Sequence, residues 1–210
     1  SLQVNAAGDV WLVGSGYVAS DQLVPRFAKF SGVDGARLFG RGVMVGQPSM
    51  FAANATLDGD GDLLLVSRST YTPYEGNALQ LDKVSASEGA RLWSRTFQAG
   101  PGMRTDSNDL VVDESGSAIV LGTRSILPSP FSPGQFEDIF LAAFDGVDGE
   151  LRWQISHDFG RQAIDTAIRA GIAPDGGIRV VAAAATAAGA RIAVINVDPD
   201  LFARHGFESE

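Results

Sequence analysis

The segment "LVVDESGSAIVLGT", residues 110–123, carries the pattern that decides the fold. A short apolar run comes first, a polar turn containing Gly116 follows, and a second apolar run leads to the small residue Gly122. Apolar runs on either side of a glycine turn are typical of a β-hairpin. The same pattern occurs three more times, in "LQVNAAGDVWLVGS" (2–15), "ATLDGDGDLLLVSR" (55–68) and "AGIAPDGGIRVVAA" (170–183).

The turn glycines set the register of the repeats. They are spaced 53, 55 and 60 residues apart, at Gly8, Gly61, Gly116 and Gly176. A small residue follows each glycine after six positions, at Gly14, Ser67, Gly122 and Ala182. The rest of the turn varies, and only the glycine is shared by all four. We therefore expect each turn glycine to adopt a positive φ, which glycine adopts without steric cost.

A second hairpin follows in each of the first three repeats. Its turn glycines are Gly35, Gly89 and Gly149, and an aromatic residue comes four positions after each, at Phe39, Trp93 and Trp153. The fourth repeat keeps the strand, within residues 192–207, but has a shorter turn. We expect the three aromatic residues to pack between neighbouring sheets, with stacking on a planar cofactor as the alternative.

Each unit of about 55 residues thus contains four predicted strands. The second strand of a unit, such as "LLLV" (63–66) or "AIVL" (118–121), is apolar on both faces, whereas a strand covered on one side would alternate. Such strands should be sandwiched between neighbouring sheets. Stacked four-stranded sheets with this period indicate an all-β fold, a β-propeller with four-stranded blades. A β-solenoid is the alternative, but its repeats are usually shorter.

The four repeats span the whole chain and predict one propeller domain or propeller segment, residues 1–210. Their approximate bounds are 1–47, 48–101, 102–162 and 163–210. The repeats either close a ring by themselves or belong to a larger ring. Because the chain begins at Ser1 without a methionine, we expect either a mature product or a fragment.

The hairpins also resemble a known family. "VVDESGSAIVLG" (111–122) and the turn that ends in "GARLW" (89–93) resemble the bacterial β-propeller repeats related to the PQQ-like repeat. In those repeats a strand that ends in a small residue follows an Asp-Gly or Ser-Gly turn, and a Gly-x-x-x-Trp strand closes each unit. The resemblance covers nearly the whole chain. It implies a propeller in an exported or cell-surface protein, often without catalytic activity, and hence an extracellular, cell-surface or periplasmic location.

Composition excludes several classes of protein. The net charge of −9 disfavours nucleic acid as a partner, because an acidic surface repels phosphates. The absence of cysteine excludes disulfides and thiolate metal sites. The longest weakly polar stretch, Val180 to Ala190, is about half of the roughly 20 residues that span a bilayer, so no membrane span is expected.

The sequence "DGDGD" (58–62) resembles a calcium loop at first sight. An EF-hand loop that began at Asp58 would need glycine at its sixth position and glutamate at its twelfth, where this chain has Leu63 and Ser69. We therefore predict a tight polar turn and no metal site. The only candidate metal ligands are Asp58, Asp60 and Asp62.

Enzymatic constellations are sparse. A quinoprotein dehydrogenase is disfavoured by the lack of a calcium set and of vicinal cysteines, so no cofactor is expected. The two histidines, His157 and His205, are expected at the surface and do not form a triad. Acidic pairs beside strand starts leave a glycosidase open, since its two carboxylates can come from distant loops. These pairs are Asp106 with Asp109 and Glu137 with Asp138.

The connections between the second and third strands are the most distinctive loops. They cover Ser15 to Pro25, Arg68 to Asn77 and Arg124 to Asp138, and they are rich in proline and aromatic residues. Exposed aromatic residues on such loops suit a recognition surface, although these rings could instead cover sheet edges. The candidate ligand-binding residues are Tyr17, Tyr71, Tyr74, Phe131 and Phe136.

These observations favour a non-catalytic recognition or structural module of an exported or cell-surface bacterial protein. It would bind protein or carbohydrate through one loop face and could pair with further propeller repeats. The alternative is a hydrolase or lyase with loop carboxylates in the central pocket of the propeller, so enzymatic activity is left open.

Overall fold

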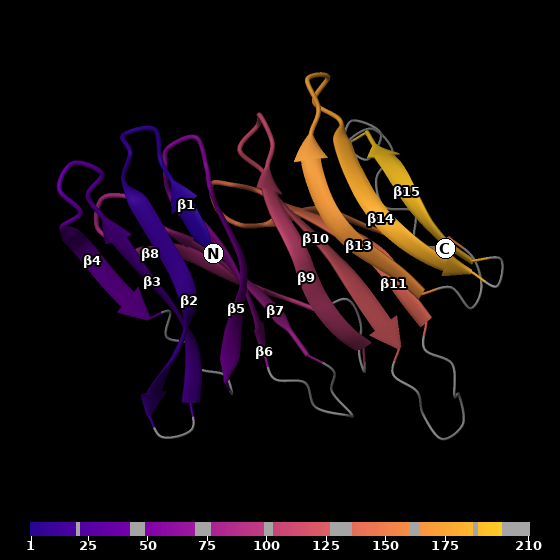
Figure 1. Cartoon of the computed structure of the whole chain (residues 1–210), viewed down its shortest axis with the longest axis horizontal. Coiled ribbons are helices and arrows are strands. Elements are labelled where there is room, and N and C mark those ends of the chain that lie inside the picture. Colours follow the sequence, from indigo (N-terminus) through magenta and orange to yellow (C-terminus); the bar gives the residue numbers. More distant parts are fainter. Residues whose placement is uncertain are drawn as a thin grey trace. The chain divides into compact units, whose positions relative to one another are not determined.

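The computed structural model shows an all-β chain (Figure 1). It describes residues 1–19, 22–42, 49–69, 77–98, 103–126, 136–159, 164–186 and 189–198. These residues form fifteen strands, and none of them lies in a helix. The chain divides into two compact units, Ser1–Pro101 and Gly102–Glu210, which are described in turn.

Unit 1 holds two antiparallel sheets of four strands, in which strands adjacent in sequence are adjacent in space. The first sheet contains β1 (Leu2–Val4), β2 (Val10–Ala19), β3 (Gln22–Phe30) and β4 (Arg37–Gly42). The second contains β5 (Met50–Leu57), β6 (Leu63–Ser69), β7 (Leu79–Val84) and β8 (Arg91–Phe97). Each sheet is therefore one predicted repeat folded as a meander.

Unit 2 repeats this arrangement. The third repeat contains β9 (Met103–Val112), β10 (Ala118–Ile126), β11 (Phe136–Phe144) and β12 (Leu151–His157). The described part of the fourth contains β13 (Ile164–Ile172), β14 (Ile178–Thr186) and β15 (Gly189–Val197). One parallel pair, Glu137 with Ile164, links β11 to β13. The four-stranded blade of a β-propeller, predicted from the repeats, is thus the building block of the chain.

The four turn glycines adopt the predicted conformation. Their φ angles are +84°, +79°, +81° and +81° at Gly8, Gly61, Gly116 and Gly176. Each glycine amide donates a hydrogen bond of 2.9–3.0 Å to the carbonyl three residues earlier, which closes the turn. A residue with a Cβ would cost about 1–2 kcal/mol in this left-handed region, so the presence of a glycine in each of the four turns has a backbone cause.

The small residues six positions after the turn glycines are not explained by one shared packing constraint. A Cβ on Gly122 would overlap the ring of Phe140 and the backbone oxygen of Asp106, so close packing requires glycine there. At Gly14 a Cβ would meet no atom within 4 Å. The small residue is thus required in the third repeat and not in the first.

A β-bulge aims each aromatic residue at the end of a repeat. The register of the third and fourth strands shifts between Lys29/Phe30, Lys83/Val84 and Ala143/Phe144. The extra residue lies directly before the aromatic one in each case, at Leu38, Leu92 and Arg152. A bulge changes the direction of the neighbouring side chain, and here it sets the direction of the aromatic ring on its sheet.

Phe39 and Trp153 pack between sheets as predicted. Phe39 lies edge-on to Trp11, with ring centroids 5.4 Å apart, and so close to Gly89 of the second sheet that a Cβ there would be 2.7 Å from the ring. Trp153 belongs to the buried cluster that includes residues of β14. Trp93 and Trp153 are each 8% exposed.

The second strand is buried in the two middle repeats, and within each unit one of its faces packs against the neighbouring sheet. Leu63 to Val66 of β6 are fully buried, and Ala118 to Leu121 of β10 are at most 2% exposed. In unit 1, Leu63 and Leu65 pack against Trp11, Val13 and Phe27 of the first sheet. In unit 2 the corresponding cluster joins β10 and β11 to β14.

In the first and fourth repeats the prediction holds for one face of the second strand. In β2 the buried residues Trp11 and Val13 alternate with Leu12, which is 44% exposed. In β14 the buried Ile178 and Val180 alternate with Arg179, which is only partly buried. An apolar sequence on both faces of a strand therefore did not imply that both faces are buried.

No helix among the described residues is long and apolar enough to cross a membrane.

Replacing Trp93 or Trp153 by alanine should lower the free energy of unfolding by about 3–5 kcal/mol, because each ring is buried and its loss leaves a cavity. Urea unfolding followed by circular dichroism measures the change. Leu92→Ala, at a neighbouring residue that is 53% exposed, is the matched control and should change stability by less than about 0.5 kcal/mol. Unchanged midpoints for both tryptophan variants would contradict the packing described above.

Candidate functional site

The predicted aromatic ligand-binding residues are only partly described by the structure. Tyr17 lies in β2 and is 67% exposed. Phe136 is the first residue of β11, and its side chain is outside the description. Tyr71, Tyr74 and Phe131 lie outside the described residues. Only Tyr17 therefore presents an exposed ring that the structure places.

The predicted loop from Ser15 to Pro25 is mostly strand, which corrects the sequence-based expectation. β2 and β3 pair through Ser15 with Pro25, Gly16 with Val24 and Tyr17 with Leu23. Pro25 lies just beyond the last described pair of β3 and β4, where a missing ladder donor is tolerated. The proline thus marks the end of a ladder and not the end of a strand.

In unit 1, β2 and β6 end on the same side of the sheets, opposite the glycine turns (Figure 1). Side chains at this end link the two sheets. Ser15 Oγ accepts a hydrogen bond of 2.9 Å from the Ala52 amide, and the Leu23 amide donates to Ser49 Oγ at 3.2 Å. The third predicted loop belongs to unit 2, and its residues 127–135 are outside the description.

The "DGDGD" turn is held by a buried lysine. Lys83 Nζ lies 2.8 Å from Asp58 and 3.7 Å from Asp62. Asp58 also accepts backbone hydrogen bonds from Asp60 and Asp62, and Asp62 accepts one of 2.7 Å from the Ala86 amide. The first and last aspartates therefore organise the turn, while Asp60 is exposed.

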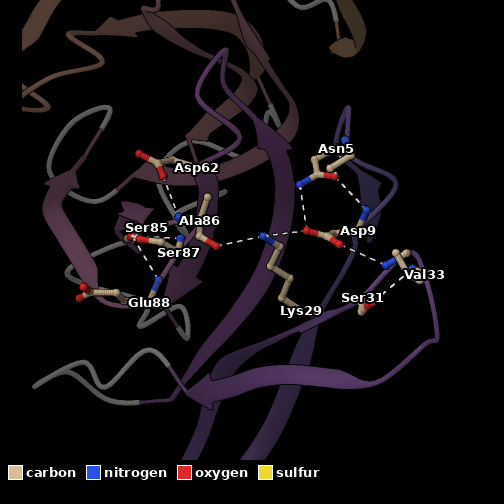
Figure 2. Close-up of polar contacts among 12 residues, drawn as sticks. Asn5, Asp9, Lys29, Ser31, Val33, Asp62, Ser85, Ala86, Ser87 and Glu88 are labelled. Atoms are coloured by element: carbon tan, nitrogen blue, oxygen red, sulfur yellow. Dashed lines mark hydrogen bonds and ion pairs between the residues drawn. The ribbon is translucent and has the colours of Figure 1, made fainter.

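The first repeat has the same arrangement, and a hydrogen bond joins it to the second (Figure 2). Lys29 Nζ lies 3.1 Å from Asp9 and donates to the carbonyl of Ala86 at 3.0 Å. The hydrogen bond from the Gly32 amide and the contact with Lys29 lower the pKa of Asp9. These are the only two lysines of the protein, and both are nearly buried.

The third repeat uses an arginine instead. The position of Lys83 is occupied by Ala143, and Arg152 donates to Asp145 at 2.6 Å and to Ser117 at 2.8 Å. The Arg152 guanidinium lowers the pKa of Asp145. In three repeats, therefore, the glycine-turn end of the sheet carries a cation paired with an aspartate of a turn.

A second buried carboxylate lies in the middle of unit 1. Asp82 of β7 is fully buried, and Gln80 donates a hydrogen bond of 2.7 Å to its Oδ2. Arg91 Nη1 is 3.7 Å from Oδ1, beyond hydrogen-bond distance. Burial raises the pKa of Asp82. This group lies within the sheet among β6–β8 and is a structural feature without access to a ligand.

Of the two acidic pairs that the sequence suggested, at most one belongs to a candidate site. Asp106 pairs with Arg104 at 2.8 Å, while Asp109 accepts a hydrogen bond of 2.9 Å from the Ala170 amide. Asp109 thus links β9 to β13 and acts in packing. The other predicted pair, Glu137 and Asp138, starts β11, where Arg124 contacts Asp138 Oδ2 through two nitrogens at 2.9 and 3.1 Å.

The most unusual group of titratable residues surrounds Asp165. Asp165 is the second residue of β13 and is fully buried; its Oδ2 accepts a hydrogen bond of 2.7 Å from the Phe159 amide. Its Oδ1 has no hydrogen-bond partner. Burial raises the pKa of Asp165, and the charges of Asp158 and Asp138 act in the same direction. His157, which acts in the opposite direction, is exposed as predicted and lies edge-on to Phe159 at 4.5 Å.

This group, which we call the Asp165 cluster, contains Asp138, His157, Asp158 and Asp165. Its members come from the start of β11, the end of β12 and the start of β13. Sequence analysis singled out His157 and Asp138 but missed Asp158 and Asp165. The sequence signal that could have revealed Asp165 is a carboxylate among apolar neighbours at the start of a strand. His205 lies outside the described residues.

Several solved structures share this fold at low sequence identity. An ulvan lyase from a new family of polysaccharide lyases matches with a TM-score of 0.61 and 10% identity, over 95% of this chain and 55% of that chain. A protein of unknown function from Dyadobacter fermentans matches with a TM-score of 0.57 and 11% identity, over 93% and 59%. A mannose phosphorylase from Leishmania mexicana matches with a TM-score of 0.53 and 12% identity, over 98% and 68%.

These similarities show the fold alone. The chain spans just over half to about two thirds of the length of these structures. No protein-family model matches the sequence, and no curated protein matches it significantly. The relation to PQQ-like repeats therefore stays a prediction.

Lys83→Met should lower the free energy of unfolding by about 3–5 kcal/mol, because it leaves the nearly buried Asp58 without its cation. Asp60→Asn, at an exposed carboxylate of the same turn, should leave stability unchanged.

Thermal melts of the wild type with calcium and with a chelator should coincide. A higher melting temperature with calcium would show a metal bound to the native state and contradict this account.

Asp82→Asn should remove a pH-dependent part of the stability. Because its pKa is raised on folding, the protonated native form is favoured, and stability falls as pH rises from 3.8 through the raised value. The asparagine variant should lack this fall. Asp175→Asn is the control of opposite sign, since the Gly177 amide and Arg179 lower the pKa of Asp175 and its contribution is lost as pH falls. Urea unfolding at a series of pH values separates the two; a profile unchanged by Asp82→Asn would contradict the assignment.

Proposed function

We propose that the protein cleaves glycosidic bonds, as a hydrolase or a lyase, at the Asp165 cluster. The observation that carries the proposal is the buried Asp165, with one unpartnered oxygen, at a sheet end where the charges of Asp138, Asp158 and His157 act on it. A buried carboxyl with a shifted pKa beside exposed titratable side chains marks a candidate functional site.

The exposed members of the cluster would contact the substrate. His157 and Asp158 are both exposed at the end of β12, and each can accept a proton or donate one in its protonated form. Asp138 is about one quarter exposed and is oriented by Arg124. An inverting glycosidase needs a carboxylic acid and a carboxylate that flank the bond, and a lyase needs a base beside the abstracted proton.

Asp165 would act as a positioning residue. It is inaccessible, and its carboxylate accepts the amide hydrogen of Phe159. This hydrogen bond fixes the backbone just after His157 and Asp158. Phe159 in turn packs edge-on against the His157 ring, so the geometry of the exposed pair depends on Asp165.

The fold supports a carbohydrate substrate by analogy. Two of the similar structures are, by name, a polysaccharide lyase and a mannose phosphorylase. Fold likeness alone does not transfer an activity. The net charge of −9 favours neutral glycans over polyanions at long range. An exported or cell-surface location, part of this proposal, would give access to polymers.

Asp158→Asn and His157→Gln should each lower the cleavage rate by about 10²–10⁴-fold, the usual contribution of an acid or base. Purified protein is incubated with a panel of neutral and uronic-acid polysaccharides. New reducing ends measure cleavage, and ultraviolet absorbance of an unsaturated product separates a lyase from a hydrolase. Asp175→Asn, at a mostly exposed aspartate in the β13–β14 turn, is the matched control and should keep full activity.

Two outcomes would contradict the proposal. One is that no polysaccharide of the panel is cleaved. The other is that activity survives in both variants, which would place the chemistry elsewhere. Asp165→Asn should lower the rate and also alter its pH profile, which distinguishes a positioning role from a merely structural one.

A recognition module is the second candidate, supported by Tyr17. Its ring is 67% exposed beside Val18, which is 42% exposed, on the β2–β3 hairpin. Tyrosine combines apolar area with a hydroxyl and suits contacts with protein or sugar. Polysaccharide binding without cleavage, lost in Tyr17→Ala, would favour this function over the enzyme.

A further inference from the structure

Six aspartates of the chain are followed directly by glycine, and this dipeptide undergoes a characteristic reaction. They are Asp34, Asp58, Asp60, Asp145, Asp148 and Asp175. When the backbone nitrogen of the glycine attacks Cγ of the aspartate, a five-membered succinimide ring forms and water leaves. Glycine permits this close approach because it has no Cβ. Whether a given pair reacts therefore depends on how the structure holds the carboxyl group of its aspartate.

The same hydrogen bond holds five of the six carboxyl groups. Oδ1 of each accepts the amide hydrogen of the residue two positions later, at 2.7–3.0 Å, which is the contact of an Asx turn. The five are Asp34, Asp58, Asp145, Asp148 and Asp175. An amide that donates to a carboxyl group favours its ionised form. The ionised form is unreactive toward the glycine nitrogen, because the reaction needs a hydroxyl group that can leave as water.

Cations reinforce this protection at three of the five carboxylates. The ion pairs are Asp58 with Lys83 at 2.8 Å, Asp145 with Arg152 at 2.6 Å and Asp175 with Arg179 at 2.7 Å. The Arg152 guanidinium lowers the pKa of Asp145, so this carboxyl group stays ionised over a wider range of pH. These three aspartates are therefore held in the unreactive form by two kinds of contact.

Asp60 is the exception among the six. It is exposed, and its carboxyl group accepts no hydrogen bond and forms no ion pair within the part of the chain that the structure describes. The cause lies in the overlapping pairs of "DGDGD" (58–62). The amide of Asp62, two positions after Asp60, donates to Oδ1 of Asp58 at 2.9 Å, and the Asp60 amide donates to the same oxygen at 3.0 Å. Asp58 thus takes the donor that would otherwise hold the Asp60 carboxyl group.

We infer that the Asp60–Gly61 pair is the site at which the folded protein forms isoaspartate. The Gly61 nitrogen bonds to Cγ of Asp60, and the amide hydrogen leaves with the carboxyl hydroxyl group as water. Water then adds to the main-chain carbonyl carbon of the succinimide and breaks its bond to nitrogen. The chain now continues through Cγ, and the mass of the residue is unchanged. The two steps release and consume one water and need no other reactant.

The product lengthens the backbone of the β5–β6 turn by one methylene group. Gly61 closes this turn through its hydrogen bond of 3.0 Å to the Asp58 carbonyl. Asp62 accepts the Ala86 amide of the next turn at 2.7 Å (Figure 2). Both contacts depend on the backbone spacing within the turn. The new α-carboxylate belongs to an exposed residue, where a methyltransferase that acts on isoaspartate can reach it.

Peptide mapping of the full chain, incubated at mildly acidic pH with and without urea, tests the inference. Chromatography separates each isoaspartyl peptide from the aspartyl peptide of equal mass. In the folded protein, isoaspartate should form at Asp60 about tenfold to a hundredfold faster than at the other five positions, because each of those must first lose a hydrogen bond to a charged group. In urea, where the turns are absent, the six rates should be similar.

Two matched variants assign the signal to one residue. Asp60→Glu should remove most of the isoaspartate that a methyltransferase with labelled S-adenosylmethionine detects in the folded protein, because glutamate would have to close a six-membered ring. Asp148→Glu, at a pair whose carboxyl group accepts the Glu150 amide, should leave the signal unchanged. Isoaspartate that forms elsewhere as fast as at Asp60, an Asp60 that reacts only in urea, or a signal that survives Asp60→Glu would each overturn the inference.

Discussion

The burial of sheet faces against one another is the constraint on which the rest of the structure depends. A meander such as β5–β8 has apolar residues on both faces of its second strand, and Leu63 to Val66 are all fully buried. Burying one leucine contributes about 1.5–3 kcal/mol, so an isolated sheet with such strands would forgo a large part of its stability. The sheets are therefore stable as stacked members of a series, which is why the sequence repeats.

Stacking also requires that the ends of the sheets fit together. Lys29 spans the gap in unit 1, since it pairs with Asp9 of its own sheet and donates to the Ala86 carbonyl of the next. A buried ammonium is tolerated only when its partners are in place, which makes this contact selective for the correct alignment. Arg152 of the third repeat differs, since its hydrogen bonds to Asp145 and Ser117 link two turns of its own sheet.

Much of the fold could be predicted because the chain carries an alignment within itself. The glycines predicted positive φ at Gly8, Gly61, Gly116 and Gly176, and the aromatic spacing predicted the burial of Trp93 and Trp153. Comparing the repeats with one another gave a wrong expectation where burial depends on which neighbouring sheets a repeat has. Leu12 and Leu65 are equivalent in sequence, yet only the second is covered, because burial depends on a neighbouring sheet and not on the strand.

The Asp165 cluster could be predicted only in part. His157 and Asp138 were recognised as titratable residues near strand ends, but their proximity to Asp165 arises from the parallel pairing of Glu137 with Ile164, which no local pattern specifies. The lysines were missed for a related reason. A lysine in a strand is ordinarily exposed, and the ion pairs with Asp58 and Asp62 of the β5–β6 turn help to explain why Lys83 is nearly buried.

The two ends of the sheets in unit 2 are opposite in electrostatic character. At the glycine turns, Asp145 and Asp175 face arginines, and these contacts help to lower the pKa values of both carboxyls. At the other end, burial raises the pKa of Asp165, and the charges of Asp138 and Asp158 add to the effect. Like charges around a buried carboxyl oppose folding, so this end is an unfavourable arrangement that the stacked core must offset. The sheet stack needs neither Asp158 nor His157 for its packing, because both side chains are exposed. The electrostatic cost at this end and the exposure of His157 and Asp158 are the two properties on which the proposed acid–base site depends.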